Sequence, residues 1–177
     1  MLIALTGKAG SGKSTVADIL DKEYKFVQIP LADPLKEVVS YLFGLTDEQK
    51  WDRELKETVI SRWSLSPRQM FQQFGDAMKE KFGEDFFVKI WDTYYDHWSN
   101  RNVVVPDCRF DVEAERFREM GGYIVEVVRG VGLSGSTGQH RSEFGLSTSP
   151  DFTIDNRGDL DLLRVNVASM LNELPNE

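Results

Sequence analysis

The sequence predicts an α/β fold in which five parallel strands form a sheet that is flanked by helices. Short β-branched runs alternate with longer stretches of helical periodicity, which is the pattern of repeated βαβ units. A glycine-rich turn follows the first run and leads directly into a helical segment, as in folds that bind phosphate. With 177 residues, the chain is long enough for one domain with a substantial apolar core.

The elements follow in a regular order. Strands are predicted over residues 1–6, 24–29, 102–105, 122–128 and 152–155, with a first helix over 15–21 and a last one over 159–174. Residues 33–100, between the second and third strands, are rich in helix formers and aromatic side chains. This long insertion is where we expect a substrate pocket.

The net charge and the cysteine content of the chain argue against several classes of function. The formal net charge of -8 argues against a partner that is a nucleic-acid polymer or a membrane surface, because both are anionic. The first apolar run is too short to span a membrane. Cys108 is the only cysteine, so the sequence predicts no disulfide framework and suits a reducing cytoplasm.

The strongest motif is G-x-x-x-x-G-K-[ST] at residues 7–14, the phosphate loop, which lies between a predicted strand and a predicted helix. Its backbone N–H groups and the helix N-terminus favour a triphosphate, which Lys13 would contact, and the Ser14 hydroxyl can ligate Mg²⁺. The alternative is a glycine-rich turn that binds nothing. The sequence therefore predicts ATP and Mg²⁺ here, held by Gly7, Ala9, Gly10, Ser11, Gly12, Lys13, Ser14 and Thr15.

Charged residues follow the second and third strands, where ligands of parallel sheets collect. Asp33 and Lys36 come after the second strand, and Asp107 and Arg109 come after the third. We interpret them as contacts to a phosphate acceptor, with either Asp33 or Asp107 positioning Mg²⁺. The alternatives are a helix cap for Asp33 and a structural salt bridge for the second pair.

The insertion contains two further candidate surfaces. Arg68, Gln72 and Asp76 recur at helical spacing after Ser66-Pro67, and with Gly75 they would let a flat base or sugar lie close to the backbone. A solvated helix face is the ordinary alternative. Trp91 belongs to a second aromatic helix, where it either stacks on a base or packs in the core.

Two later segments complete the predicted site. Arg129, a Gly/Ser-rich run, His140 and Arg141 form a segment that we interpret as a cationic lid, with surface charge as the alternative. Asn156 ends the last strand, where it either holds the adenine of the donor or caps a helix. None of these residues has to act as a nucleophile, because direct in-line transfer from donor to acceptor suffices.

With these residues in place, the chain resembles the phage-type deoxynucleoside monophosphate kinases of the P-loop kinase superfamily. The resemblance covers nearly the whole chain. It rests on the phosphate loop, Ala32-Asp33-Pro34-Leu35-Lys36, Ser66-Pro67-Arg68 with Gln72 and Gly75, Asp107-x-Arg109-Phe110 with Glu113-Ala114, Gly121-Gly122, and His140-x-Ser142-Glu143. Asp76, where relatives often have Thr, and Pro106 depart from the family pattern.

The resemblance implies a P-loop kinase with strand order 2-3-1-4-5 that converts deoxynucleoside monophosphates (dNMPs) to diphosphates with ATP and Mg²⁺. It implies a single domain with its core at 1–32, 101–128 and 150–177, an acceptor-binding insertion at 33–100 and a lid at 129–145. By the same resemblance, acceptor contacts would come from Arg68, Gln72, Gly75, Trp91, Asp107 and Arg109, and Arg129 and Arg141 would belong to the lid. From the motifs themselves, the residues that we expect to take part in catalysis are Lys13, Asp33, Arg109, Arg129 and Arg141.

Other functions are compatible with the same loop. One is a kinase for a different small acceptor, such as dephospho-coenzyme A, phosphomevalonate or a sugar acid. Another is a nucleotide-dependent switch, although the sequence has no N-K-x-D guanine motif. The sequence leaves open which bases are accepted, whether deoxyribose is required, and whether the chain forms a homodimer.

Overall fold

The structure, a computed structural model, describes residues 1–130 and 145–175. It contains a five-stranded parallel sheet with the order β2-β3-β1-β4-β5, which confirms the predicted fold class and strand order. The strands are β1 (Leu2–Thr6), β2 (Val27–Gln28), β3 (Val103–Val105), β4 (Tyr123–Val128) and β5 (Phe152–Asp155).

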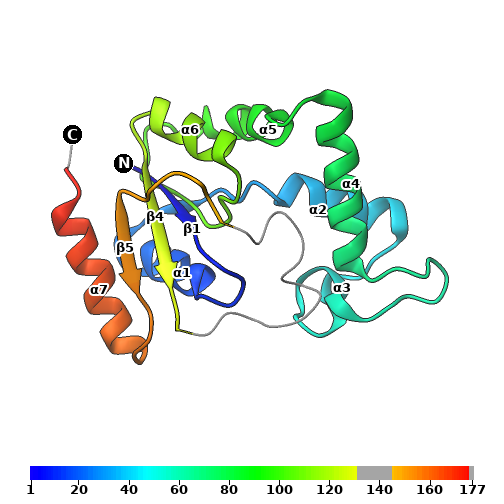
Figure 1. The fold of residues 1–177 in the computed structure, drawn as a ribbon, viewed down its shortest axis with the longest axis horizontal. Coiled ribbons are helices and arrows are strands. Elements are labelled where there is room, and N and C mark those ends of the chain that lie inside the picture. Colours follow the sequence, from blue (N-terminus) through cyan, green and yellow to red (C-terminus); the bar gives the residue numbers. More distant parts are fainter. Residues whose placement is uncertain (131–144, 176–177) are drawn as a thin grey trace. The chain divides into compact units, whose positions relative to one another are not determined.

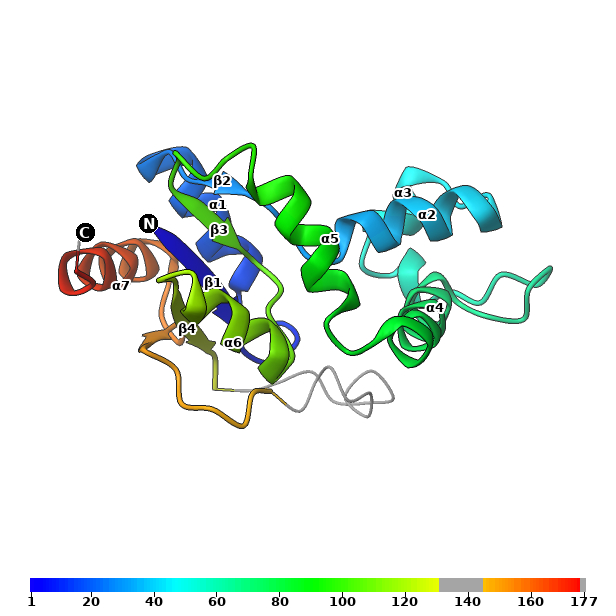
Figure 2. The ribbon, with the colours of Figure 1, turned by 90° about the horizontal axis from the view of Figure 1, so that it is seen from above.

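The central strand is buried along its whole length, as expected for a parallel sheet that is covered on both faces. All five residues of β1 are buried, and β1 pairs with β3 on one side and with β4 on the other. Helices α1 (Lys13–Tyr24) and α7 (Leu160–Glu173) pack together, α1 against β1 and α7 against β5, as Figure 1 shows. Helix α6 (Asp111–Glu119) covers β1 and β4 from the opposite face (Figure 2).

One predicted boundary is wrong. The second strand was expected to begin at residue 24, but α1 continues through Tyr24 and ends where Lys25 adopts a left-handed φ of 60°. The Lys25 N–H donates to the Asp21 carbonyl, which closes the helix and turns the chain toward β2. Here the packing of the helix outweighs the β propensity of Tyr24.

The contacts divide the chain into two compact units. The core unit is Met1–Leu31 with Trp91–Glu177, and the helical unit is Ala32–Ile90. The helical unit contains α2 (Asp33–Phe43), α3 (Asp47–Trp51), the short 3₁₀ helix η1 (Leu55–Glu57), α4 (Pro67–Phe82) and the first part of α5 (Phe86–Tyr95). Within the described ranges, no helix has both the length and the apolar composition needed to cross a membrane.

The helices of the helical unit begin at clear sequence signals. Ser66 caps α4 by accepting a hydrogen bond from the Gln69 N–H, and the Gln69 side chain accepts one from the Ser66 N–H in return. Thr46 and Gln49 form the same reciprocal pair at the start of α3. These capping boxes fix where the two helices start, and thereby which side chains share a face.

Candidate active site

The phosphate loop lies tightly against the carboxyl ends of the neighbouring strands. Gly7 and Gly12 have φ values of 129° and 103°, which side chains rarely adopt. A Cβ at Gly7 would lie 2.4 Å from the Val127 carbonyl oxygen, and one at Gly12 would lie 2.1 Å from Asn156 Nδ2. Both glycines are therefore required by backbone conformation and by space.

Lys13 is the first residue of α1, and its side chain folds back under the loop. Its Nζ donates hydrogen bonds to the carbonyl oxygens of Gly7 (2.6 Å) and Lys8 (2.9 Å). The first turn of α1 carries no acidic residue, so the positive end of the helix dipole is not compensated locally. A buried ammonium and a helix N-terminus therefore meet at one loop, which is a favourable place for an anion.

The loop also has a hydroxyl group that lacks a partner. In the described part of the chain, the buried Ser11 Oγ makes no hydrogen bond. A buried hydroxyl without a partner is costly, and a phosphate oxygen would satisfy it. Ser14 and Thr15 are exposed on the first turn of α1, where their hydroxyls remain accessible. The loop thus fits a triphosphate tail, with Ser14 available to a Mg²⁺ ion.

Asn156 supports the loop from the end of β5. It is buried, its Nδ2 donates to the Ser11 carbonyl oxygen at 2.7 Å, and its N–H donates to the Val128 carbonyl oxygen at 2.8 Å. The helix-cap alternative does not apply, since Asp159 caps α7 by accepting from the Leu162 N–H. This geometry favours a contact to the loop over the predicted contact to adenine.

The segment after β3 is held by two carboxylates. Asp107 Oδ1 accepts from the Leu31 N–H at 2.8 Å, at the point where the chain leaves the core unit. Glu113 is buried, and its Oε2 accepts from the N–H groups of Arg109 (2.7 Å) and Phe110 (3.1 Å). Sequence reasoning gave Glu113 no role, although its spacing after Phe110 is that of a helix-start signal.

Cys108 lies between these two carboxylates and is also buried. Burial, followed by the nearby negative charges of Glu113 and Asp107, raises the pKa of the Cys108 thiol well above its usual value. The thiol therefore stays protonated and takes part in packing.

Trp91 lies in the core, with an exposed fraction of 1%. Its Nε1 donates to the Ile29 carbonyl oxygen at 2.8 Å, while its ring stacks on Tyr95 and meets the edge of Phe117. This placement favours the packing alternative over stacking on a base. It also fixes the point where the chain re-enters the core unit.

In the helical unit, the predicted acceptor face of α4 is partly used for packing. A Cβ at Gly75 would lie 3.3 Å from Leu35 Cδ2, so Gly75 allows α4 to lie close to α2. Arg68, Gln72 and Asp76 are all half-buried. Arg68 pairs through its Nε with Glu57 Oε1, which comes from η1. The guanidinium of Arg68 is thus present on α4 as predicted, and it is already paired with the carboxylate of Glu57.

Asp33 and Lys36 lie in the first turn of α2. Asp33 does not cap the helix, because the N-cap position is taken by Ala32 and the helix start has no side-chain cap. Instead, the Lys36 Nζ lies 3.1 Å from Asp33 Oδ1 and 4.3 Å from the centre of the Trp51 ring. Trp51 is a neighbour that sequence reasoning missed, because its contact with Lys36 depends on how α3 folds back toward α2.

The predicted lid falls mostly outside the described residues. Arg129 and Gly130 are described and exposed. His140 and Arg141, with Ser142 and Glu143, lie outside the described part of the chain.

Comparisons with known proteins extend these findings. The sequence model of the deoxynucleotide monophosphate kinase family matches residues 1–60 and 49–167. A protein of Acanthamoeba polyphaga mimivirus named "Putative deoxynucleotide monophosphate kinase" is 34% identical and aligns with 87% of this chain and 86% of its own length.

Solved structures show the same fold at low sequence identity. TT1252 from Thermus thermophilus has a TM-score of 0.53 and 18% identity, covering 99% of this chain and 98% of that one. Dephospho-CoA kinase from Campylobacter jejuni has a TM-score of 0.50 and 14% identity, covering 97% and 96%. At these identities the likeness concerns the fold alone.

Proposed function

The chain belongs to the deoxynucleotide monophosphate kinase family, and we propose that it transfers the γ-phosphoryl group of ATP to a dNMP, giving the diphosphate. Family membership establishes a phosphotransferase of nucleotides with a P-loop kinase fold. The observation that carries the proposal is the phosphate loop, where the Lys13 ammonium, the unpartnered Ser11 hydroxyl and the N-terminus of α1 come together.

The donor half of the reaction depends on the core unit. The N–H groups of the loop and Lys13 would hold the β- and γ-phosphates, and Asn156 keeps the loop in shape. A Mg²⁺ ion, when bound at Ser14, would neutralise charge on the transferring group. Because the protein only positions and neutralises, no covalent intermediate on the chain is required.

We assign the acceptor half to residues 33–100, with Arg68, Lys36 and Gln72 as the polar contacts of the helical unit. From the core unit, Arg109 would bind the acceptor phosphate, and either Asp107 or Asp33 would orient the Mg²⁺ shell. Residues 129–145, with Arg129 and Arg141, would form the lid. Cys108 is compatible with a reducing compartment such as the cytoplasm.

The test is an acceptor panel. Purified protein is given ATP and Mg²⁺ with each common dNMP, each ribonucleotide, dephospho-coenzyme A, phosphomevalonate or a sugar acid, and both ADP and the phosphorylated acceptor are measured. We expect turnover that depends on a dNMP and a diphosphate product. Phosphorylation of another acceptor but of no dNMP, or ATP hydrolysis that needs no acceptor, would overturn the proposal.

A further inference from the structure

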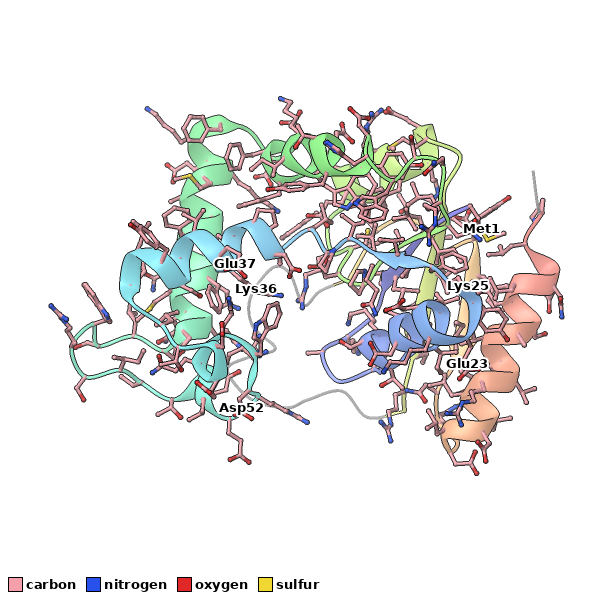
Figure 3. The ribbon with its side chains drawn as sticks, turned by 180° about the vertical axis from the view of Figure 1, so that it is seen from behind. Met1, Glu23, Lys25, Lys36, Glu37 and Asp52 are labelled. Atoms are coloured by element: carbon pink, nitrogen blue, oxygen red, sulfur yellow. The ribbon has the colours of Figure 1, made fainter. Side chains whose placement is uncertain are left out.

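Three cationic side chains come from neighbouring elements of the helical unit. Lys36 comes from α2, Lys56 from η1 and Arg68 from α4, and we call them the cationic cluster. Helix η1 packs against α4, and α4 packs against α2, so the three elements are neighbours within one compact unit. Figure 3 marks Lys36 on α2 and Asp52 on the segment just before η1.

Two members of the cluster already have anionic partners. Lys36 is held by Asp33 and by the face of Trp51, and Arg68 is held by Glu57. Lys56 differs from both. Its ammonium has no hydrogen bond or ion pair within residues 1–130 and 145–175, although the side chain is half-buried.

The backbone holds Lys56 in place. Asp52 Oδ1 accepts hydrogen bonds from the N–H groups of Glu54 and Leu55, each at 2.9 Å, and the Asp52 carbonyl accepts from the Lys56 N–H at 3.2 Å. This tight turn sets the direction of η1. The position of Lys56 therefore depends on this hydrogen-bonded turn at the surface of the helical unit.

The surroundings of Lys56 carry a surplus of positive charge. Burial lowers the pKa of Lys56, and the charges of Arg68 and Lys36 lower it further, while Glu57 and Asp52 offset only part of this. A cation that is partly desolvated beside two others is stabilised by an arriving anion. Three donors on separate elements can contact a phosphate monoester from several sides.

We propose that Lys56 completes, with Arg68 and Lys36, a binding site for the phosphate group of the acceptor, and that this phosphate replaces Glu57 as the partner of Arg68. The inference rests on the proposed function and names a residue that the family match does not assign. Glu57 holds Arg68 in place until the acceptor arrives. Lys56 is the cation that remains available to attract it.

The first experiment compares Lys56→Met with Arg53→Met. Arg53 lies on the same segment and is more exposed than Lys56, so its variant removes the same charge from a side chain that is not half-buried. We expect Lys56→Met to raise KM for the dNMP by about 10- to 100-fold, with KM for ATP and the melting temperature nearly unchanged. Arg53→Met should keep the wild-type KM for both. Equal KM values for the dNMP in wild type and Lys56→Met would overturn the inference while leaving the proposed function in place.

The second experiment measures ligand binding at Lys56 without relying on enzyme activity. The wild-type protein is acetylated at low reagent concentration, alone and with dNMP or inorganic phosphate, and labelling of each lysine is measured by mass spectrometry. We expect both ligands to protect Lys56 but not the exposed Lys81. Protection by phosphate from a protein that phosphorylates no dNMP would keep the site and refute the proposed function. Absence of protection by either ligand would refute the site.

Discussion

The phosphate loop and the cationic cluster both present positive charge, but they are held in different ways. The loop is fixed by backbone and buried contacts, such as the hydrogen bond from Asn156 to the Ser11 carbonyl oxygen, which joins residues far apart in sequence. The cluster is held by side-chain ion pairs that are partly exposed, including Arg68 with Glu57. A loop fixed in this way is ready for its ligand, whereas the cluster has to exchange partners. We therefore expect large effects from changes in the loop and graded effects from changes at the acceptor.

Lys13→Ala should give the largest effect. We expect kcat to fall by at least about 100- to 1,000-fold, because the ammonium is lost where charge develops on the transferring group. The fold should persist, since no core volume is removed. Steady-state assays and thermal melts check both points, with Lys22→Ala, an exposed lysine of α1, as control. Activity close to wild type would show that Lys13 does not bind the donor. The phosphate loop would then be no more sensitive to substitution than the cationic cluster.

Gly12→Ala tests whether the phosphate loop has room for a side chain at position 12. The new Cβ would lie 2.1 Å from Asn156 Nδ2, and overpacking of this kind costs about 1–3 kcal/mol. Gly44→Ala is the matched control, because Gly44 also has a positive φ, 66°, but open space around its Cβ position. Denaturant unfolding should show the larger loss for Gly12→Ala, and adding Asn156→Ala should recover part of it. Equal losses for the two glycines would mean that backbone conformation alone matters.

Arg109→Ala should affect the acceptor and spare the donor. We expect KM for the dNMP to rise by about 10-fold or more, as for the loss of a charge-assisted hydrogen bond, with KM for ATP nearly constant. Arg101→Ala, an exposed arginine before β3, serves as control in the same steady-state assay. If the KM values for the dNMP and for ATP rise together, Arg109 contacts the donor as well, and donor and acceptor contacts are not separate.

Cys108 should give the smallest effect, seen only at high pH. Its pKa is raised in the folded state, so above its ordinary value of 9.0 the unfolded chain loses a proton that the folded chain retains. The free energy of unfolding should then decrease with pH by up to about 1.4 kcal/mol per unit. Urea unfolding of wild type and Cys108→Ala between neutral pH and pH ~10 measures the difference in slope. Parallel curves would show that the thiol ionises equally in both states.

Much of the fold could be predicted from the sequence because its signals are local. The phosphate loop combines a strand, glycines and a helix start within a short stretch, and the apolar runs set the strand positions. The second strand shows the limit of this reasoning: the run that includes Tyr24 looks extended, yet the helix before it continues. Its end is set by packing, which a single sequence window does not contain.

Individual site residues were harder to interpret, because their roles depend on partners that are distant in sequence. Nothing near Asn156 in the sequence indicates Ser11, and nothing near Gly75 indicates Leu35. Lys56 has no motif at all, since its significance comes from the charges that η1 and α4 bring beside it. Residue type and spacing therefore identified candidate chemistry, while the three-dimensional fold showed which side chains are already engaged.

The two crossings between the core unit and the helical unit have a consequence for the segment between them. The chain leaves after Leu31, tied to Asp107, and returns at Trp91, tied to Ile29, so exit and return are fastened at neighbouring positions on one stretch of backbone. The segment of residues 32–90 therefore starts and ends at neighbouring positions of the core unit, as an inserted unit does. We therefore expect changes in the length of the inserted segment to leave the register of the strands in the core unit unaltered.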